Sequence, residues 1–181
     1  LVCLLTYRLS FNFFGPGTGL LALVILATTP LLFTQGIAAT TDAVLLATIV
    51  AAFFIFEAAL RRGPKTVNAL GLGLVLGAAL LTKGPVGLVI PVLSIVAILI
   101  LGRRLSGGWI KYLLISVLLA TGIFLAWGIP ANQATGGEFL RRGIGYHLVD
   151  RMSKPLETHG GNFFLFLPYY IPVVILAFFP W

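Results

Sequence analysis

Residues 66–102, TVNALGLGLVLGAALLTKGPVGLVIPVLSIVAILILG, decide the fold. Two long apolar runs meet at Lys83-Gly84-Pro85, and Lys83 is the only charged residue of the stretch. A helix that crosses a bilayer needs about 20 predominantly apolar residues, and each run approaches that length. Glycine and proline are the usual breakers between helices. The stretch therefore predicts a helical hairpin in a membrane, with Lys83 at its tip.

The whole chain shares this composition. Of its 181 residues, 59% are hydrophobic and 9% are charged, whereas soluble domains carry about a quarter charged residues. This excludes a soluble domain, and it excludes a disordered segment, which needs low hydrophobicity. Cys3 is the only cysteine, which excludes a disulfide scaffold. The predicted fold class is all-α, a polytopic transmembrane helical bundle.

Seven apolar runs are predicted as membrane spans. They cover residues 1–9, 18–36, 43–60, 66–82, 86–102, 109–129 and 163–180. Residues 130–162 form the only long polar stretch, predicted as an outer loop with a short amphipathic helix at 138–152. The first run reads as the tail of a helix, and Met152 is the only methionine. We therefore expect residues 1–181 to be a partial transmembrane domain, internal to a longer protein.

Proline and glycine also punctuate the spans. Pro30, Pro91, Pro168 and Pro172 lie inside helical runs and are predicted to kink them. Gly73 and Gly77 form a small-xxx-small pair, which is typical of close helix packing in membranes.

The net charge of +7 is best explained by topology. A nucleic-acid binder needs a continuous basic face, but these basic residues form small clusters between apolar runs, so no nucleic-acid partner is expected. Cytoplasmic loops are enriched in Lys and Arg. We therefore place every second junction inside, namely those with Arg8, Arg61, Arg62, Lys65, Arg103, Arg104 and Lys111. Trp109 and Tyr112 would be interfacial anchors at this inner edge.

The remaining junctions, near residues 36–42, 83–85 and 130–162, then lie outside. Of the five acidic residues only Glu57 lies near the inner side, so the chemically capable residues gather on the outer face. The alternation predicts that one outer, water-facing end carries any reaction.

Asp42 and Lys83 each have two interpretations. Thr40-Thr41-Asp42 opens a helix, where Thr and Asp commonly cap free N–H groups. Alternatively, Asp42 is a carboxylate at the rim of a cavity, orienting a sugar or helping a proton move. Lys83 is either a lysine that snorkels at a hairpin tip or, beside the helix that begins at Pro85, part of an anion site for a phosphate.

The outer loop concentrates polar chemistry. Its candidate residues are Glu138, Arg141, Arg142, Tyr146, His147, Asp150, Arg151, Glu157 and His159. On a helix, His147 and Arg151 share a face at a spacing of four. Histidine and carboxylates suit a divalent metal, although the spacing of the histidines is no metal signature. The alternative is an interfacial amphipathic helix whose basic face meets anionic headgroups.

In combination, these motifs resemble one family. The motifs are Thr40-Thr41-Asp42, then LTKGPVG at 81–87, then Gly145-Tyr146-His147, Asp150-Arg151, Lys154-Pro155-Leu156-Glu157 and His159-Gly160-Gly161. They resemble the polyprenyl-phosphate-dependent glycosyltransferases of GT-C type, in the bacterial aminoarabinose-transferase-like branch related to protein O-mannosyltransferases. The resemblance covers essentially the whole chain.

The resemblance implies a function and roles for individual residues. A sugar would move from a polyprenyl-phosphate donor to an acceptor lipid or protein, at the periplasmic face of a bacterial inner membrane. Lys83 and Arg151 would bind the donor phosphate, and Asp42 would match a functionally important acidic residue of the cavity, with a catalytic role. His147 would belong to a metal site, for Zn, Mg or Mn. Tyr146, Glu138, Asp150 and His159 would line the substrate cavity.

The same resemblance implies direct displacement with inversion, and no nucleotide. The family's presumed catalytic base would lie upstream of Leu1, so we expect residues 1–181 alone to be inactive. The sugar and the acceptor, which includes lipid A among its candidates, stay open.

Two other functions compete. A transporter or flippase for a lipid-linked substrate would also need kinked helices and intramembrane charge, but transporters place polar groups near the midplane and often carry repeats. The helix centres here are almost free of charge, and no repeat is visible. An assembly subunit without chemistry would leave the one-sided cluster of acids, histidines and cations unexplained.

Overall fold

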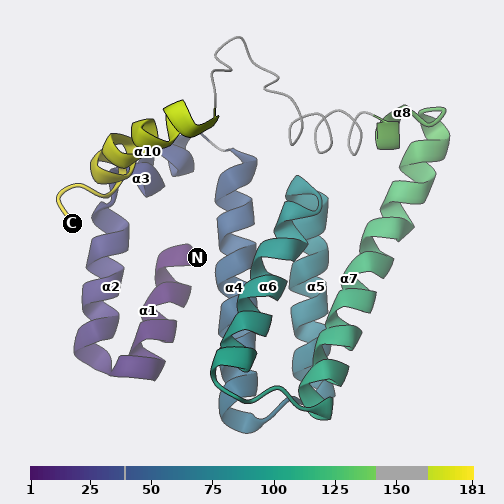
Figure 1. The fold of residues 1–181 in the computed structure, drawn as a ribbon, viewed down its shortest axis with the longest axis horizontal. Helices are drawn as coiled ribbons and strands as arrows, with labels where there is room; N and C mark the ends of the chain where they lie inside the picture. The colour runs from purple at the N-terminus through teal and green to yellow at the C-terminus, as the bar shows by residue number, and fades with distance from the viewer. Residues whose placement is uncertain (39, 142–162) are drawn as a thin grey trace. The chain divides into compact units, whose positions relative to one another are not determined.

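The structure, a computed structural model, describes residues 1–38, 40–141 and 163–181, and those residues form helices and no strand. The all-α prediction is confirmed. The helices are α1 (Val2–Phe14), α2 (Pro16–Thr28), α3 (Pro30–Ile37), α4 (Thr41–Arg62), α5 (Thr66–Lys83), α6 (Val86–Leu101), α7 (Gly107–Ala134), α8 (Glu138–Leu140) and α10 (Phe163–Phe178) (Figure 1).

The chain divides into two compact units. Residues 1–28 and 32–125 form the first unit, and residues 29–31 and 126–181 form the second. The first unit contains α1, α2, most of α3, and α4 to α6 with the greater part of α7. It therefore contains nearly all of the helical bundle.

The breaks between helices follow the predicted glycines and prolines. Gly15 has a φ of +93°, a left-handed value that glycine adopts without strain, and Pro16 begins α2. The sequence predicted that Pro30 only kinks a helix, and this prediction is wrong. Pro30 begins a separate helix, and α2 and α3 are bent by 57° across the break. Pro91, Pro168 and Pro172 do lie inside helices, as predicted.

The core of the first unit lies among α4, α5, α6 and α7. It is built largely from leucine, isoleucine and alanine, with Phe56, Trp109 and Tyr112 as its aromatic members. Small side chains let helix backbones approach closely, which is the main source of packing energy between helices in lipid. Large apolar side chains, such as Leu93 and Leu118, are also exposed on the outside of the bundle. This arrangement suits helices that are surrounded by lipid.

The predicted glycine pair packs α5 against α7. A Cβ atom at Gly73 would lie 2.9 Å from the carbonyl oxygen of Ser116, and one at Gly77 would lie 2.7 Å from Cδ1 of Ile123. In addition, Ser116 Oγ lies 2.9 Å from the carbonyl oxygen of Ala69, within hydrogen-bond distance. The small-xxx-small interpretation is confirmed, since the two helices touch where the glycines lie.

Trp109 and Tyr112 are not interfacial anchors, because both side chains are buried. The Trp109 ring packs edge-to-face against Phe56, with centroids 5.7 Å apart, and against Tyr112, with centroids 5.4 Å apart. Aromatic pairs favour this geometry. These rings therefore join α4 to the first turns of α7, instead of reaching the headgroup layer.

Three helices are long and apolar enough to cross a membrane, among the residues that the structure describes. They are α4, α5 and α7, and the bent pair of α2 and α3 would make a fourth. The spans predicted at 1–9, 86–102 and 163–180 correspond to helices of 13, 16 and 16 residues. The span predicted at 109–129 extends through Pro130 to Ala134, into the predicted outer loop. The chain is an integral membrane protein, and its number of crossings stays a prediction.

Consecutive helices of the bundle run in opposite directions. Figure 1 shows the start of α4 and the turn between α5 and α6 at one end, and the turns after α4 and α6 at the other. The first end carries Asp42 and Lys83. The second carries Arg61, Arg62, Lys65, Arg103 and Arg104. The segregation of charge predicted from the sequence therefore exists for these residues. Arg8, predicted at an inner junction, instead lies within α1.

Candidate functional site

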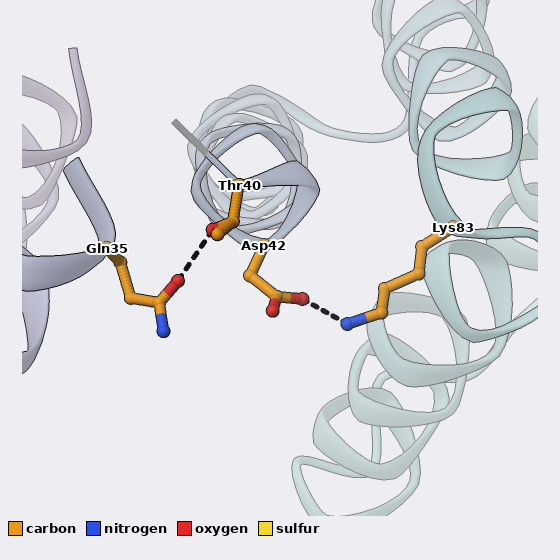
Figure 2. Close-up of polar contacts among 4 residues, drawn as sticks. All are labelled: Gln35, Thr40, Asp42 and Lys83. Carbon is orange, nitrogen blue, oxygen red and sulfur yellow. Dashed lines mark hydrogen bonds and ion pairs between the residues drawn. The ribbon is translucent and has the colours of Figure 1, made fainter. Parts of the chain in front are cut away.

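The centre of the candidate site is an ion pair between Asp42 and Lys83. Asp42 lies in the first turn of α4, and Lys83 is the last residue of α5. The Lys83 ammonium donates to Oδ1 of Asp42, as Figure 2 shows. The side chains are 47% and 45% exposed, so the pair is reachable from outside the bundle. Two residues that the sequence placed on one face are thus in direct contact.

A capping hydrogen bond from Thr40 does not explain the Thr40-Thr41-Asp42 motif. Thr40 is at the N-cap position of α4, but its side chain makes no capping hydrogen bond. Its hydroxyl instead donates to Oε1 of Gln35 in α3, at 2.6 Å (Figure 2). The Asp42 carboxylate is engaged by Lys83. Both side chains therefore make contacts between helices. Asp42 also lies in the first turn of α4, where a carboxylate suits the helix dipole, so both interpretations of Asp42 stay predictions.

Gln35 was not identified from the sequence. It lies in the apolar run of residues 18–36 and belongs to no motif. Its side-chain amide is a rare polar group in that run and lies five residues before Thr40. This could have indicated a role for Gln35 from the sequence. The hydrogen bond between Gln35 and Thr40 ties α3 to the start of α4.

The turn at Lys83-Gly84-Pro85 is tight, and two glycines, Gly84 in the turn and Gly87 just after it, allow this. Gly84 has a φ of +67°, and its N–H donates to the carbonyl oxygen of Leu80 at 2.8 Å. Pro85 occupies the N-cap of α6, one position earlier than the helical position that the sequence suggested. A Cβ atom at Gly87 would lie only 2.3 Å from the Ala79 carbonyl oxygen. The two helices therefore approach closely just beyond the turn, and this fixes where α5 ends and where Lys83 lies.

A second acidic group, Glu57, is buried near the opposite end of α4. It is 3% exposed, forms an ion pair with Arg61 one turn further on, and accepts a hydrogen bond from Nδ2 of Asn12 at 3.3 Å. The sequence placed Glu57 near the inner side but did not predict its burial or its contact with α1. Burial of an unpaired charge is costly, and the contacts with Arg61 and Asn12 offset that cost for the Glu57 carboxylate.

Glu138 lies in the second unit, in α8. Its carboxylate accepts a hydrogen bond from Nη2 of Arg141 at 2.7 Å, and both side chains are well exposed. Nearby, the rings of Trp127 and Phe139 pack edge-to-face with centroids 5.0 Å apart. The start of the predicted loop helix is thus helical, and its role in a substrate cavity stays a prediction.

The other predicted loop residues, Tyr146, His147, Asp150, Arg151 and His159, lie outside the described residues. Across residues 1–38, 40–141 and 163–181, no group of three or more His, Cys, Asp or Glu side chains could hold a metal ion. The predicted metal site, which depends on His147, stays a prediction.

Comparison with known proteins gives two matches. The model of the dolichyl-phosphate-mannose-protein mannosyltransferase family matches residues 1–127. A curated relative, undecaprenyl phosphate-alpha-4-amino-4-deoxy-L-arabinose arabinosyl transferase 2 of Pseudomonas fluorescens, is 30% identical over 111 residues. Those residues are 61% of this chain and 18% of the relative, so the chain aligns with less than a fifth of the relative's length. No solved structure matches.

The family model covers both halves of the contact described above, because Asp42 and Lys83 fall within residues 1–127. The resemblance read from the motifs is thereby confirmed at the level of the family. This chain belongs to the dolichyl-phosphate-mannose-protein mannosyltransferase family, within the GT-C glycosyltransferases.

Proposed function

We propose that the protein is a membrane glycosyltransferase that moves a sugar from a polyprenyl-phosphate donor to an acceptor lipid or protein. The observation that carries the proposal is the accessible Lys83 ammonium at one end of the bundle, paired with the Asp42 carboxylate. The names of the family and of the relative support it, since both contain a polyprenyl phosphate. Their sugars differ, so the proposal commits to the phosphate and not to mannose or aminoarabinose.

In the proposed reaction, the acceptor attacks the anomeric carbon directly and inverts it. The bond between that carbon and the phosphate oxygen breaks, its electron pair stays on the phosphate, and the acceptor loses a proton. The phosphate gains negative charge as the bond breaks. Lys83, with Arg151, would stabilise that charge more in the transition state than in the ground state, which is what accelerates a reaction.

Asp42 would orient the sugar or help the acceptor's proton to leave. We further propose that Tyr146, Glu138, Asp150 and His159 contribute to the substrate cavity, and that His147 contributes to a site for a divalent metal. The site would face the periplasm of a bacterial inner membrane, in agreement with the charge segregation along the bundle.

The test is sugar transfer by the complete protein with Lys83→Met and, separately, Arg151→Met. Loss of a preorganised group that stabilises developing charge costs about 100-fold or more in rate, so we expect each variant to lose transfer on that scale. Lys65→Met, at the opposite end of the bundle, is the matched control and should transfer normally. Normal transfer by both Lys83→Met and Arg151→Met would contradict the proposal.

A further inference from the structure

The Asp42 carboxylate affects how a phosphate can bind at Lys83, apart from any catalytic role. The carboxylate already occupies one of the three N–H donors of the Lys83 ammonium. A phosphate bound to the remaining donors would therefore lie beside a fixed negative charge. Like charges at such a distance repel, and the repulsion increases with the charge of the phosphate.

The structure holds Asp42 in this position. Thr40, two residues earlier, is tied to Gln35 of α3 by a hydrogen bond of 2.6 Å, so the first turn of α4 is fixed on its other side (Figure 2). Lys83 is fixed by the tight turn at Gly84 and by the close approach of Gly87 to Ala79. The ion pair thus joins two anchored chain segments, which keeps the Asp42 carboxylate within reach of Lys83.

The two phosphates of the proposed reaction differ in charge. The donor is a phosphodiester with one negative charge, whereas the polyprenyl phosphate left after transfer is a monoester, which carries close to two at neutral pH. A lysine alone would bind the monoester more tightly, and so would retain the product. An adjacent carboxylate opposes that preference.

We propose that Asp42 is a specificity residue that lowers the preference of Lys83 for phosphomonoesters over phosphodiesters, and so favours donor binding and product release. This inference rests on the proposed function, because it requires the phosphate to bind at Lys83. It gives Asp42 a role in binding that is separate from any role in moving a proton.

The experiment measures binding of two probes to the complete protein in lipid nanodiscs by isothermal titration calorimetry. The probes are a polyprenyl monophosphate and its monomethyl ester, which share a tail and differ by one charge. In Asp42→Asn the carboxylate charge is lost with little change of shape. One unit of charge at a water-accessible site a few ångströms away changes affinity by about three- to tenfold. We expect the ratio of monoester to diester affinity to increase by that factor.

Asp42→Glu is the matched control, since it keeps the charge, and its affinity ratio should equal that of the unsubstituted protein. Asp42→Ser is a second neutral variant and should behave as Asp42→Asn does. An unchanged ratio in both neutral variants would overturn the inference. Lys83→Met separates the two proposals: it should weaken both probes, and if it weakens neither, the phosphate site of the proposed function is itself wrong.

Discussion

Asn12 of α1 donates a hydrogen bond from Nδ2 to Oε2 of Glu57 in α4, at 3.3 Å. The two residues are 45 positions apart, and the carboxylate is also paired with Arg61. This contact provides α1 with a polar attachment to the bundle in an otherwise apolar setting. Because Glu57 is 3% exposed, water cannot replace its partners if they are lost.

We expect Glu57→Ala to lower the free energy of unfolding by about 1.5–3 kcal/mol, the usual contribution of a hydrogen bond to a charged group. Glu57→Gln keeps an acceptor oxygen for Asn12 and should lose less. Thermal unfolding in detergent measures both variants. If Glu57→Ala unfolds at the same temperature as the unsubstituted protein, the contact does not hold α1 in place.

The ion pair between Asp42 and Lys83 should contribute little to stability. Both side chains are nearly half exposed, and exposed ion pairs contribute about 0–1 kcal/mol. Asp42→Asn and Lys83→Met should therefore unfold within about 1 kcal/mol of the unsubstituted protein, although the proposed function expects Lys83→Met to lose transfer. The same unfolding assay checks this. A large loss of stability in either variant would show that the main role of the ion pair is to stabilise the fold.

Gly87→Ala should destabilise the hairpin of α5 and α6. The new Cβ would lie 2.3 Å from the Ala79 carbonyl oxygen, a backbone atom that moves only with its helix. Overpacking of this kind costs about 1–3 kcal/mol. Gly122→Ala is the matched control, because a Cβ there meets nothing within 4 Å. Equal unfolding temperatures for the two variants would contradict the close approach of the helices.

The two ends of the bundle should lie on opposite sides of the membrane. In a Cys3→Ser background, single cysteines at Val86 and Ser106 report on the turn beside Lys83 and on the turn after α6, respectively. Both positions are exposed. An impermeant maleimide added outside intact cells should label Val86→Cys, and Ser106→Cys should react only after the membrane is opened. Labelling of both from outside would exclude the predicted topology.

The sequence was sufficient to predict the helices and the segregation of charge. Both depend on local composition: apolar runs specify helices in lipid, and breakers such as Gly15 and Gly84 set their ends. The break at Pro30 was read as a kink. A proline inside an apolar run removes one helical hydrogen bond whether it kinks a helix or ends it, so the sequence alone did not distinguish a kink from the 57° break.

The contacts of the candidate site could be predicted only in part. Asp42 and Lys83 were selected because ionisable groups are rare in such a chain, which is a property of sequence. Their pairing across 41 positions, the hydrogen bond from Thr40 to Gln35, and the burial of Trp109 and Tyr112 are tertiary. An aromatic residue near a helix end suits an interface or a core equally, and only packing against Phe56 distinguishes the two.

The axial register of α5 against α7 is fixed by two kinds of contact. Ser116 contacts the carbonyl oxygen of Ala69, and Gly73 and Gly77 face Leu119 and Ile123. A slide of either helix by one turn would break the hydrogen bond and force large side chains against each other. The position of Lys83 along the bundle is consequently determined by α7 as well as by α5. A residue inserted into α5 between Gly77 and Lys83 would displace both the ammonium and the buried Ala79, which Gly87 of α6 approaches.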